Sequence, residues 1–161
     1  MAVDPEAFKQ AMSQFASGVT VVTTVHEGRR HGLTASAFTS LSLDPPLVLV
    51  CIGRRLKTHD LIAEAGVFAV NVLGAHQLEL GKRFAGLTPV KDRFQGLVTA
   101  TAETGSPLLP DVLAWVDCRV RNVHEGGDHS IFVGEVVALS AAEAGAPLLY
   151  HNRVWHRTEP L

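Results

Sequence analysis

The chain of 161 residues has few charged side chains, few aromatic side chains and only two cysteines. Charged residues make up 19% of it, the formal net charge is −2, and the isoelectric point is near 6.4. No cluster of basic side chains exceeds Arg54, Arg55 and Lys57. This charge balance lacks the basic footprint of a nucleic-acid-binding protein. We therefore expect no nucleic acid partner.

Cysteine and histidine are also sparse in the patterns that bind metals. Cys51 and Cys118 lie far apart in apolar stretches, which indicates two buried thiols in a reducing compartment and not a disulfide. The eight histidines show neither HxH nor HExxH spacing, so we expect no metal. Long apolar runs of roughly 18 residues and a signal-peptide pattern are both missing, which predicts a cytoplasmic protein with no membrane partner.

What the chain does have is apolar bulk, because hydrophobic residues make up 47% of it. A chain of this length fits one domain, which we expect to span residues 1–161. With so little charge at the surface, we expect part of that surface to be buried against another subunit.

The most informative stretch runs from His31 to Pro46 and reads HGLTASAFTSLSLDPP. Its small residues let a ligand approach the backbone closely, and its hydroxyls add donors and acceptors for a flat polar heterocycle. The same composition also fits an ordinary strand with a Ser/Thr face. Pro45 and Pro46 end the stretch because proline has no N–H for a sheet ladder.

Capping signals predict three helices. The first begins at Asp4, ends at Gly18 and has an apolar face that we expect to pack. The second has Thr58 as its N-cap and ends at Gly66, and the third covers residues 75–84. Apolar and β-branched runs predict strands at residues 19–25, 47–52, 67–73, 114–123 and 129–139, with a last pair within residues 147–155.

Glycine-containing turns join the first strand to the stretch at His31 and the two long strands after residue 114, so both pairs should be hairpins. The run at 47–52 indicates burial on both faces. Residues 86–110 lack periodicity and predict a binding loop or a dimer arm, with a short strand at 97–101. Without a βαβ rhythm and GxGxxG, this order favours an antiparallel barrel with helical insertions over a dinucleotide-binding fold.

The basic cluster precedes the predicted second helix. Basic side chains beside the free N–H groups of a helix N-terminus suit a phosphate. A solvated basic turn explains these residues alone equally well.

Five segments together resemble the flavin reductase-like family, which includes the small reductase components of two-component flavin-dependent monooxygenases. They cover nearly the whole chain in the right order. The segments are FASGVTVVTT (15–24), HGLTASAFTSLSLDPPLVLV (31–50), FAVNVL (68–73), RFAG (83–86) and GDHSIFVGEV (127–136). The resemblance implies a mainly β fold with α insertions, a split β-barrel with Greek-key connections, and a homodimer with one FMN per subunit near its interface.

The resemblance also implies roles for particular residues. His129 would lie near the nicotinamide of NADH or NADPH, and Asp128 either orients it or serves the turn. FMN, with FAD possible, would be bound by three groups of residues. These are Thr34, Ala35, Ser36, Ala37, Ser40 and Leu41 with Cys51 and Ile52 along the isoalloxazine ring; Arg55, Lys57 and Thr58 at the phosphate; and Phe84, Ala85 and Gly86 in a closing loop.

The implied activity is that of an NAD(P)H:flavin oxidoreductase that passes reduced flavin to a separate oxygenase. One alternative is an electron-transfer flavoprotein that holds FMN without nicotinamide turnover, and another is a non-catalytic barrel that binds a small ligand. The individual residues have plainer interpretations too. Thr34 and Ser36 would satisfy strand edges, and His129 would be a solvated first residue of a strand.

Overall fold

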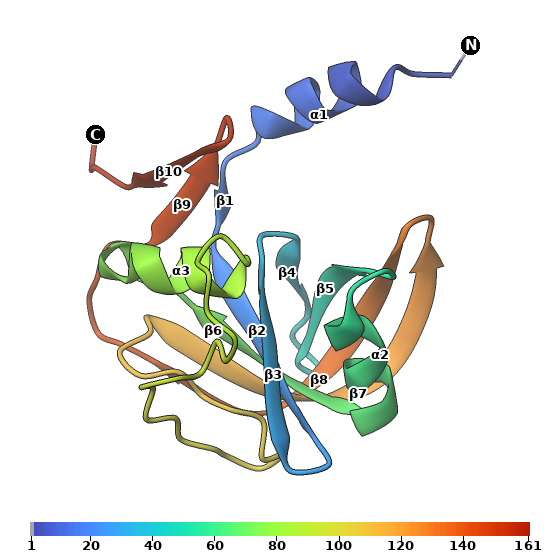
Figure 1. Ribbon diagram of the computed structural model, residues 1–161, viewed down its shortest axis with the longest axis vertical. Helices are drawn as coiled ribbons and strands as arrows, with labels where there is room; N and C mark the ends of the chain where they lie inside the picture. Colours follow the sequence, from blue (N-terminus) through green and yellow to red (C-terminus); the bar gives the residue numbers. More distant parts are fainter. Residues whose placement is uncertain (1) are drawn as a thin grey trace.

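The chain forms a large curled sheet and a small sheet that projects from it (Figure 1). The computed structural model describes residues 2–161. The large sheet is antiparallel and has the order β3 (Arg29–Ala35), β2 (Thr20–His26), β6 (Val67–Val72), β7 (Ala114–Gly126), β8 (His129–Ala141), β5 (Leu47–Gly53) and β4 (Phe38–Ser42). The small sheet has the order β1 (Ser17–Gly18), β9 (Leu148–His151) and β10 (Val154–Arg157). The helical elements are α1 (Pro5–Ser13), α2 (Lys57–Ala65), the 3-10 helix η1 (Ala75–Gln77) and α3 (Leu78–Phe84).

The large sheet curls but does not close. Its edge strands β3 and β4 are consecutive in the chain, yet within residues 2–161 they form no ladder with each other. Two β-bulges between β7 and β8, one in each strand, help to bend the sheet, since a bulge increases the local twist. Just before β4, the carbonyl of Ala37 accepts a hydrogen bond from the N–H of Cys51 in β5 at 2.9 Å, which extends the β4–β5 ladder by one residue. The mainly β, antiparallel prediction is confirmed, but the sheet is not a closed barrel.

Both predicted hairpins are present. β2 pairs with β3, and β7 pairs with β8 along most of their length. Gly28 and Gly127 both have φ of 72°, a conformation that costs glycine little and other residues more.

The apolar residues form two cores, one on each face of β2. Val22 lies in the first, inside the curl, where α2 covers it through Ile62. Val21 lies in the second, between the sheet, α3 and the segment that follows it. Gly134 lets the first core close tightly, because a Cβ at this position would lie 2.9 Å from the Cβ of Cys118 and would overlap the ring of Phe68.

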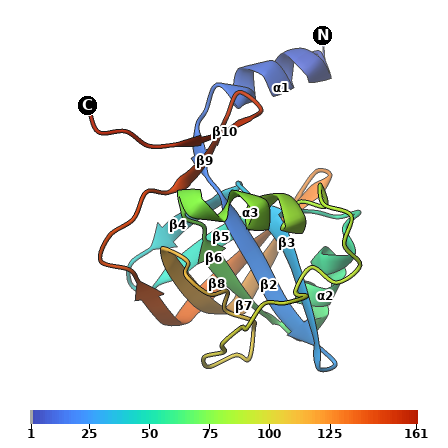
Figure 2. The same ribbon diagram turned by 60° about the vertical axis from the view of Figure 1, so that its left-hand side comes forward.

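The first helix differs from the prediction. Asp4 caps it as expected, accepting a hydrogen bond from the Ala7 N–H at 2.9 Å, but the helix ends at Ser13 instead of Gly18. Its expected packing is also wrong within this chain, since none of its residues is buried. In both views α1 and the small sheet stand away from the large sheet (Figures 1 and 2).

Three smaller predictions are also corrected. Leu56, not Thr58, is the N-cap of α2, because the helix already begins at Lys57. β5 is buried on one face only, so Cys51 is partly exposed while Cys118 is buried as expected. Burial, helped by the charge of Asp117, raises the pKa of the Cys118 thiol to about 12. The short strand predicted at residues 97–101 is reduced to a single bridge between Ala100 and Leu108.

Residues 85–113 form a long segment that two buried polar side chains attach to the sheet. Asn71 of β6 accepts a hydrogen bond from the Leu109 N–H at 2.8 Å, and Asp117 of β7 accepts one from the Thr104 N–H at 2.8 Å. A buried amide or carboxylate needs such partners to offset its desolvation. These contacts hold the segment against β2, β6 and β7.

None of the helices in the described residues is long and apolar enough to cross a bilayer. Residues 2–161 likewise contain no group of three or more His, Cys, Asp or Glu side chains placed to bind a metal ion.

Candidate active site

The stretch that crosses from β3 to β4 lies at the opening of the curled sheet. The Thr34 hydroxyl donates to the carbonyl of Gly81 in α3 at 2.7 Å, and the carbonyl of Ala35 accepts from the Thr20 hydroxyl at 2.7 Å. The next two residues, Ser36 and Ala37, are exposed. The anchored strand therefore holds an accessible pair of small residues at the gap.

Ser36 lines three hollows, and two of these also contain other residues predicted to bind flavin. The first measures about 330 Å³, and it brings Thr34 and Ala85 together with Tyr150 and Trp155 from the small sheet. The second measures about 560 Å³ and is mostly apolar. It is lined by Met12, Phe15, Ser17, Ser36, Ala37, Phe38, Thr39, Leu49 and Cys51. The apolar lining and the exposed backbone suit a flat, partly polar ring.

A separate hollow of about 280 Å³, which Ser36 does not line, is strongly basic. We call it the cationic pocket. Its lining includes Lys57 and Thr58 at the start of α2, together with five further polar side chains, four of which are charged. These are Arg30, His31, Lys91, Asp92 and Arg93. Burial, with the positive charges of Lys57, His26 and Arg29, lowers the pKa of His31. Positive charge is thus concentrated here, which favours an anionic group.

The basic cluster seen in the sequence is divided between two places. Lys57 lines the cationic pocket, whereas Arg54 lies 3.6 Å from Glu125 at the tip of the β7–β8 hairpin. The charge of Arg55 acts on Asp128 in the same hairpin and helps to lower the pKa of that carboxyl. Arg55 therefore lies near the hairpin and is not among the residues that line the cationic pocket.

His129 lies at the start of β8 and is about half exposed. Its Nδ1 is 2.7 Å from the Asp128 carboxylate, a hydrogen bond that is the main cause of the lowered pKa of Asp128. Because a carboxylate only accepts hydrogen bonds, Nδ1 carries the proton, and Nε2 is the nitrogen left for a ligand. Asp128 also serves the turn through its carbonyl, which accepts from the Arg54 N–H at 2.9 Å.

Strand register places His129 beside the second hollow. Gly53 pairs with His129, and Cys51 pairs with Ile131 two residues further along. Paired residues in an antiparallel sheet share a face. His129 therefore lies on the face of β5 and β8 that carries Cys51, while Ile52 and Ser130 lie on the inner face.

Comparison with known families shows which family the chain belongs to. Residues 12–159 match the family model described as "Flavin reductase like domain". The chain belongs to this family.

Named relatives agree with this assignment. The chain is 39% identical over 160 residues to the reductase subunit HsaB of a flavin-dependent monooxygenase from Mycobacterium tuberculosis, covering 98% of this chain and 84% of that protein. It is 43% identical to an NADH:riboflavin 5'-phosphate oxidoreductase from Streptomyces pristinaespiralis, covering 99% and 91%. The structure of the NADH:FAD oxidoreductase SgcE6 from Streptomyces globisporus, solved with NAD and FAD fragments, has a TM-score of 0.90 and 35% identity over 99% of this chain and 98% of that one. The oxidoreductase prediction is thus confirmed at family level.

In this flavin reductase-like chain, the residues predicted to bind flavin occupy several environments. Ser40 and Leu41 are exposed on edge strand β4. Ile52 and Phe84 are each 1% exposed, so their side chains belong to the two cores. Gly86 has φ of 77°, and a Cβ there would lie 3.3 Å from Arg93.

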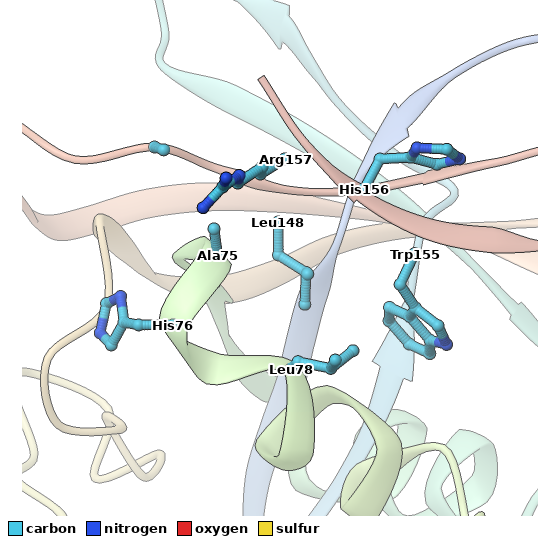
Figure 3. Close-up of a pocket in the computed structure, with 8 residues that line it drawn as sticks. Ala75, His76, Leu78, Leu148, Trp155, His156 and Arg157 are labelled. Carbon is cyan, nitrogen blue, oxygen red and sulfur yellow. The ribbon is translucent and has the colours of Figure 1, made fainter. Parts of the chain in front are cut away.

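Sequence reasoning missed the basic residues that complete the cationic pocket and the small-sheet residues beside Ser36. Arg93 donates to the carbonyls of Gly32 and Phe84 at 3.0 and 2.9 Å, joining a loop, a strand and a helix end that are distant in sequence. No local pattern marks such a meeting point. Trp155 lines the hollow beside Thr34 and also a separate one of about 510 Å³ between η1, α3 and β10 (Figure 3). That separate hollow contains none of the predicted site residues.

Proposed function

We propose that the protein is an NAD(P)H-dependent flavin reductase that passes reduced flavin to a partner oxygenase. The observation that carries the proposal is the convergence of three features within a flavin reductase-like fold. An exposed pair of small residues, Ser36 and Ala37, lines an apolar hollow. The strand that precedes this pair, β3, contributes residues to the cationic pocket. His129 lies on the same sheet face as Cys51, which lines the hollow.

The residues present fit a flavin phosphate ester. A bound flavin supplies the chemistry, because its N5 accepts a hydride from the reduced nicotinamide C4. Ser36 and Ala37 offer backbone groups to the polar edge of the ring, where donors stabilise the negative charge that develops. Lys57 and Thr58, with the N-terminus of α2, bind the phosphate. The cationic pocket also suits the pyrophosphate of FAD, and the flavins in relatives' names differ.

His129 orients the second substrate in this proposal. With Nδ1 fixed by Asp128, Nε2 is placed to hydrogen-bond the nicotinamide carboxamide. The reaction needs no strong base, so the residue positions a ring and transfers no proton. The names of the relatives favour NADH as the donor.

Replacing His129 by alanine should lower kcat/KM for NADH about threefold to tenfold, the loss of one hydrogen bond, and leave the flavin dissociation constant within about twofold. Stopped-flow reduction and a flavin titration measure the two effects. His156→Ala, which removes an exposed histidine of β10, is the matched control. Normal reduction with weaker flavin binding would reverse the assignment, and no change in either would make His129 a strand residue only.

Steady-state NADH oxidation with and without added flavin tests the function as a whole. A rate that depends on added flavin supports the reductase. Tight FMN without NADH turnover supports the alternative electron-transfer flavoprotein, and neither supports a ligand-binding barrel. The reductase subunit name of the M. tuberculosis relative favours an oxygenase as the acceptor of the reduced flavin.

A homodimer is the second part of the proposal. Phe8, Met12 and Phe15 are 58%, 54% and 79% exposed, although they lie on and just after one short helix and line the hollows near Ser36. Large apolar side chains gathered in this way mark an interaction surface. A second copy covering them would complete the flavin hollow from its open side.

We expect sedimentation at micromolar concentration to give a species of twice the chain mass. The double variant Phe8→Ser, Met12→Ser should sediment as the monomer, because it removes apolar area from the contact. Val98→Ser, an exposed apolar residue of the long segment, should leave the dimer intact. Wild-type protein that sediments only as a monomer would contradict this proposal.

A further inference from the structure

His59 of α2 is held in one orientation by three contacts. Its Nδ1 lies 2.8 Å from the Asp60 carboxylate, and its Nε2 lies 2.9 Å from the Ser130 hydroxyl. Its ring packs edge-on against Phe132, with centroids 5.2 Å apart. The side chain is only 13% exposed. Because the carboxylate only accepts, Nδ1 carries the proton, and in the neutral ring Nε2 accepts from the Ser130 hydroxyl.

The arrangement resembles the Ser–His–Asp geometry of a hydrolase, but burial excludes that role. Ser130 is 5% exposed and lies on the inner face of β8. A nucleophilic serine must reach a substrate carbonyl. The bond between His59 and Ser130 is therefore a connection between two elements.

The two elements are those that carry the proposed substrate contacts. His59 follows Lys57 and Thr58 of the cationic pocket directly, and Ser130 follows His129 directly. The bond from the Arg54 N–H to the Asp128 carbonyl makes a second connection on the other side of the turn. The first turn of α2 and the turn before it are thus each joined to the start of β8 by a hydrogen bond.

We propose that His59 is a positioning residue that couples the phosphate end of the flavin site to the nicotinamide site. The inference rests on the proposed function. When a phosphate is held at Lys57 and Thr58, the first turn of α2 is fixed, and the His59–Ser130 bond fixes the start of β8, where His129 meets the nicotinamide. Such a coupling is reciprocal and typically changes an affinity five-fold or more.

The test compares FMN with riboflavin, which lacks the phosphate. In the wild-type protein the KM for NADH should be at least about five-fold lower with FMN than with riboflavin. His59→Ala and Ser130→Ala should each bring the two KM values within about twofold of one another. The double variant should go no further, because both changes remove the same bond. His76→Ala, which removes an exposed histidine from the hollow in Figure 3, is the matched control.

Two further measurements separate coupling from stability. His59→Gln keeps an amide that can bond to Ser130 and should restore part of the difference between the flavins, whereas thermal melts record any loss of folding. Single variants that melt lower but keep the five-fold difference would overturn the proposal. If the wild-type KM for NADH is the same with FMN and with riboflavin, the coupling is overturned and the reductase function stands. If the wild-type protein does not oxidise NADH, both proposals are overturned.

Discussion

Replacing Lys57 by alanine will weaken FMN binding about tenfold to a hundredfold and leave riboflavin binding nearly unchanged. Lys57 lies in the cationic pocket at the first turn of α2, where burial and then the charge of Lys57 lower the pKa of His31. A charge-assisted hydrogen bond to a phosphate contributes about 1.5–3 kcal/mol. Riboflavin has no phosphate, so it cannot lose this bond.

Calorimetric titration with both flavins measures the effect. Lys82→Ala is the matched control, because Lys82 is also a helical lysine but pairs with Glu79 of α3 at 2.8 Å. Salt should weaken FMN binding to the wild type more than to Lys57→Ala, since screening acts on the charge that the variant lacks. If both flavins weaken equally, Lys57 does not contact the phosphate.

Replacing Phe68 by alanine will lower the free energy of unfolding by about 3–5 kcal/mol, because the ring is fully buried in the core inside the curl. Urea denaturation followed by circular dichroism measures the loss. Val98→Ala is the control, since a side chain that is 87% exposed should change stability by less than about 0.5 kcal/mol.

The ring of Phe68 also fills the space in front of Gly134. Gly134→Ala alone should destabilise the fold by about 1–3 kcal/mol through overpacking. In the Phe68→Ala background the added methyl group enters vacated space, so the double variant should lose less than the sum of the two single losses. Additive losses would show that Phe68 and Gly134 are not in contact in solution.

Local chemistry predicted much of the fold. Gly28 and Gly127 marked the hairpin turns, and Gly66 marked the end of α2, where its N–H donates to the Ile62 carbonyl. Periodicity showed which face of α1 is apolar but not what covers it, because a pattern records the composition of a face and not its partner. The continuous apolar run of β5 predicts burial on both faces, although Cys51 faces a hollow.

The candidate site was less predictable for a related reason. The stretch around Ser36 and the basic residues before α2 could be found from sequence, because each is continuous in the chain. The cationic pocket joins His31 of β3 to Arg93 of the long segment, and the hollow beside Thr34 takes Trp155 from the small sheet. The curl of the sheet brings these residues together, and the local sequence around each of them does not predict this contact.

Residues 85–113 are attached to β6 and β7 by buried hydrogen bonds, which make it costly to detach this segment from the sheet. Thr104 and Leu109 are bonded to carboxylate and amide oxygens of Asp117 and Asn71, which are both 0% exposed. Lifting this segment would leave two buried polar groups without partners, at about 1–3 kcal/mol each. The segment therefore belongs to the same cooperative unfolding unit as β6 and β7. Arg93 and Phe94 of the same segment line the cationic pocket, so we expect ligands to exchange without displacement of this wall.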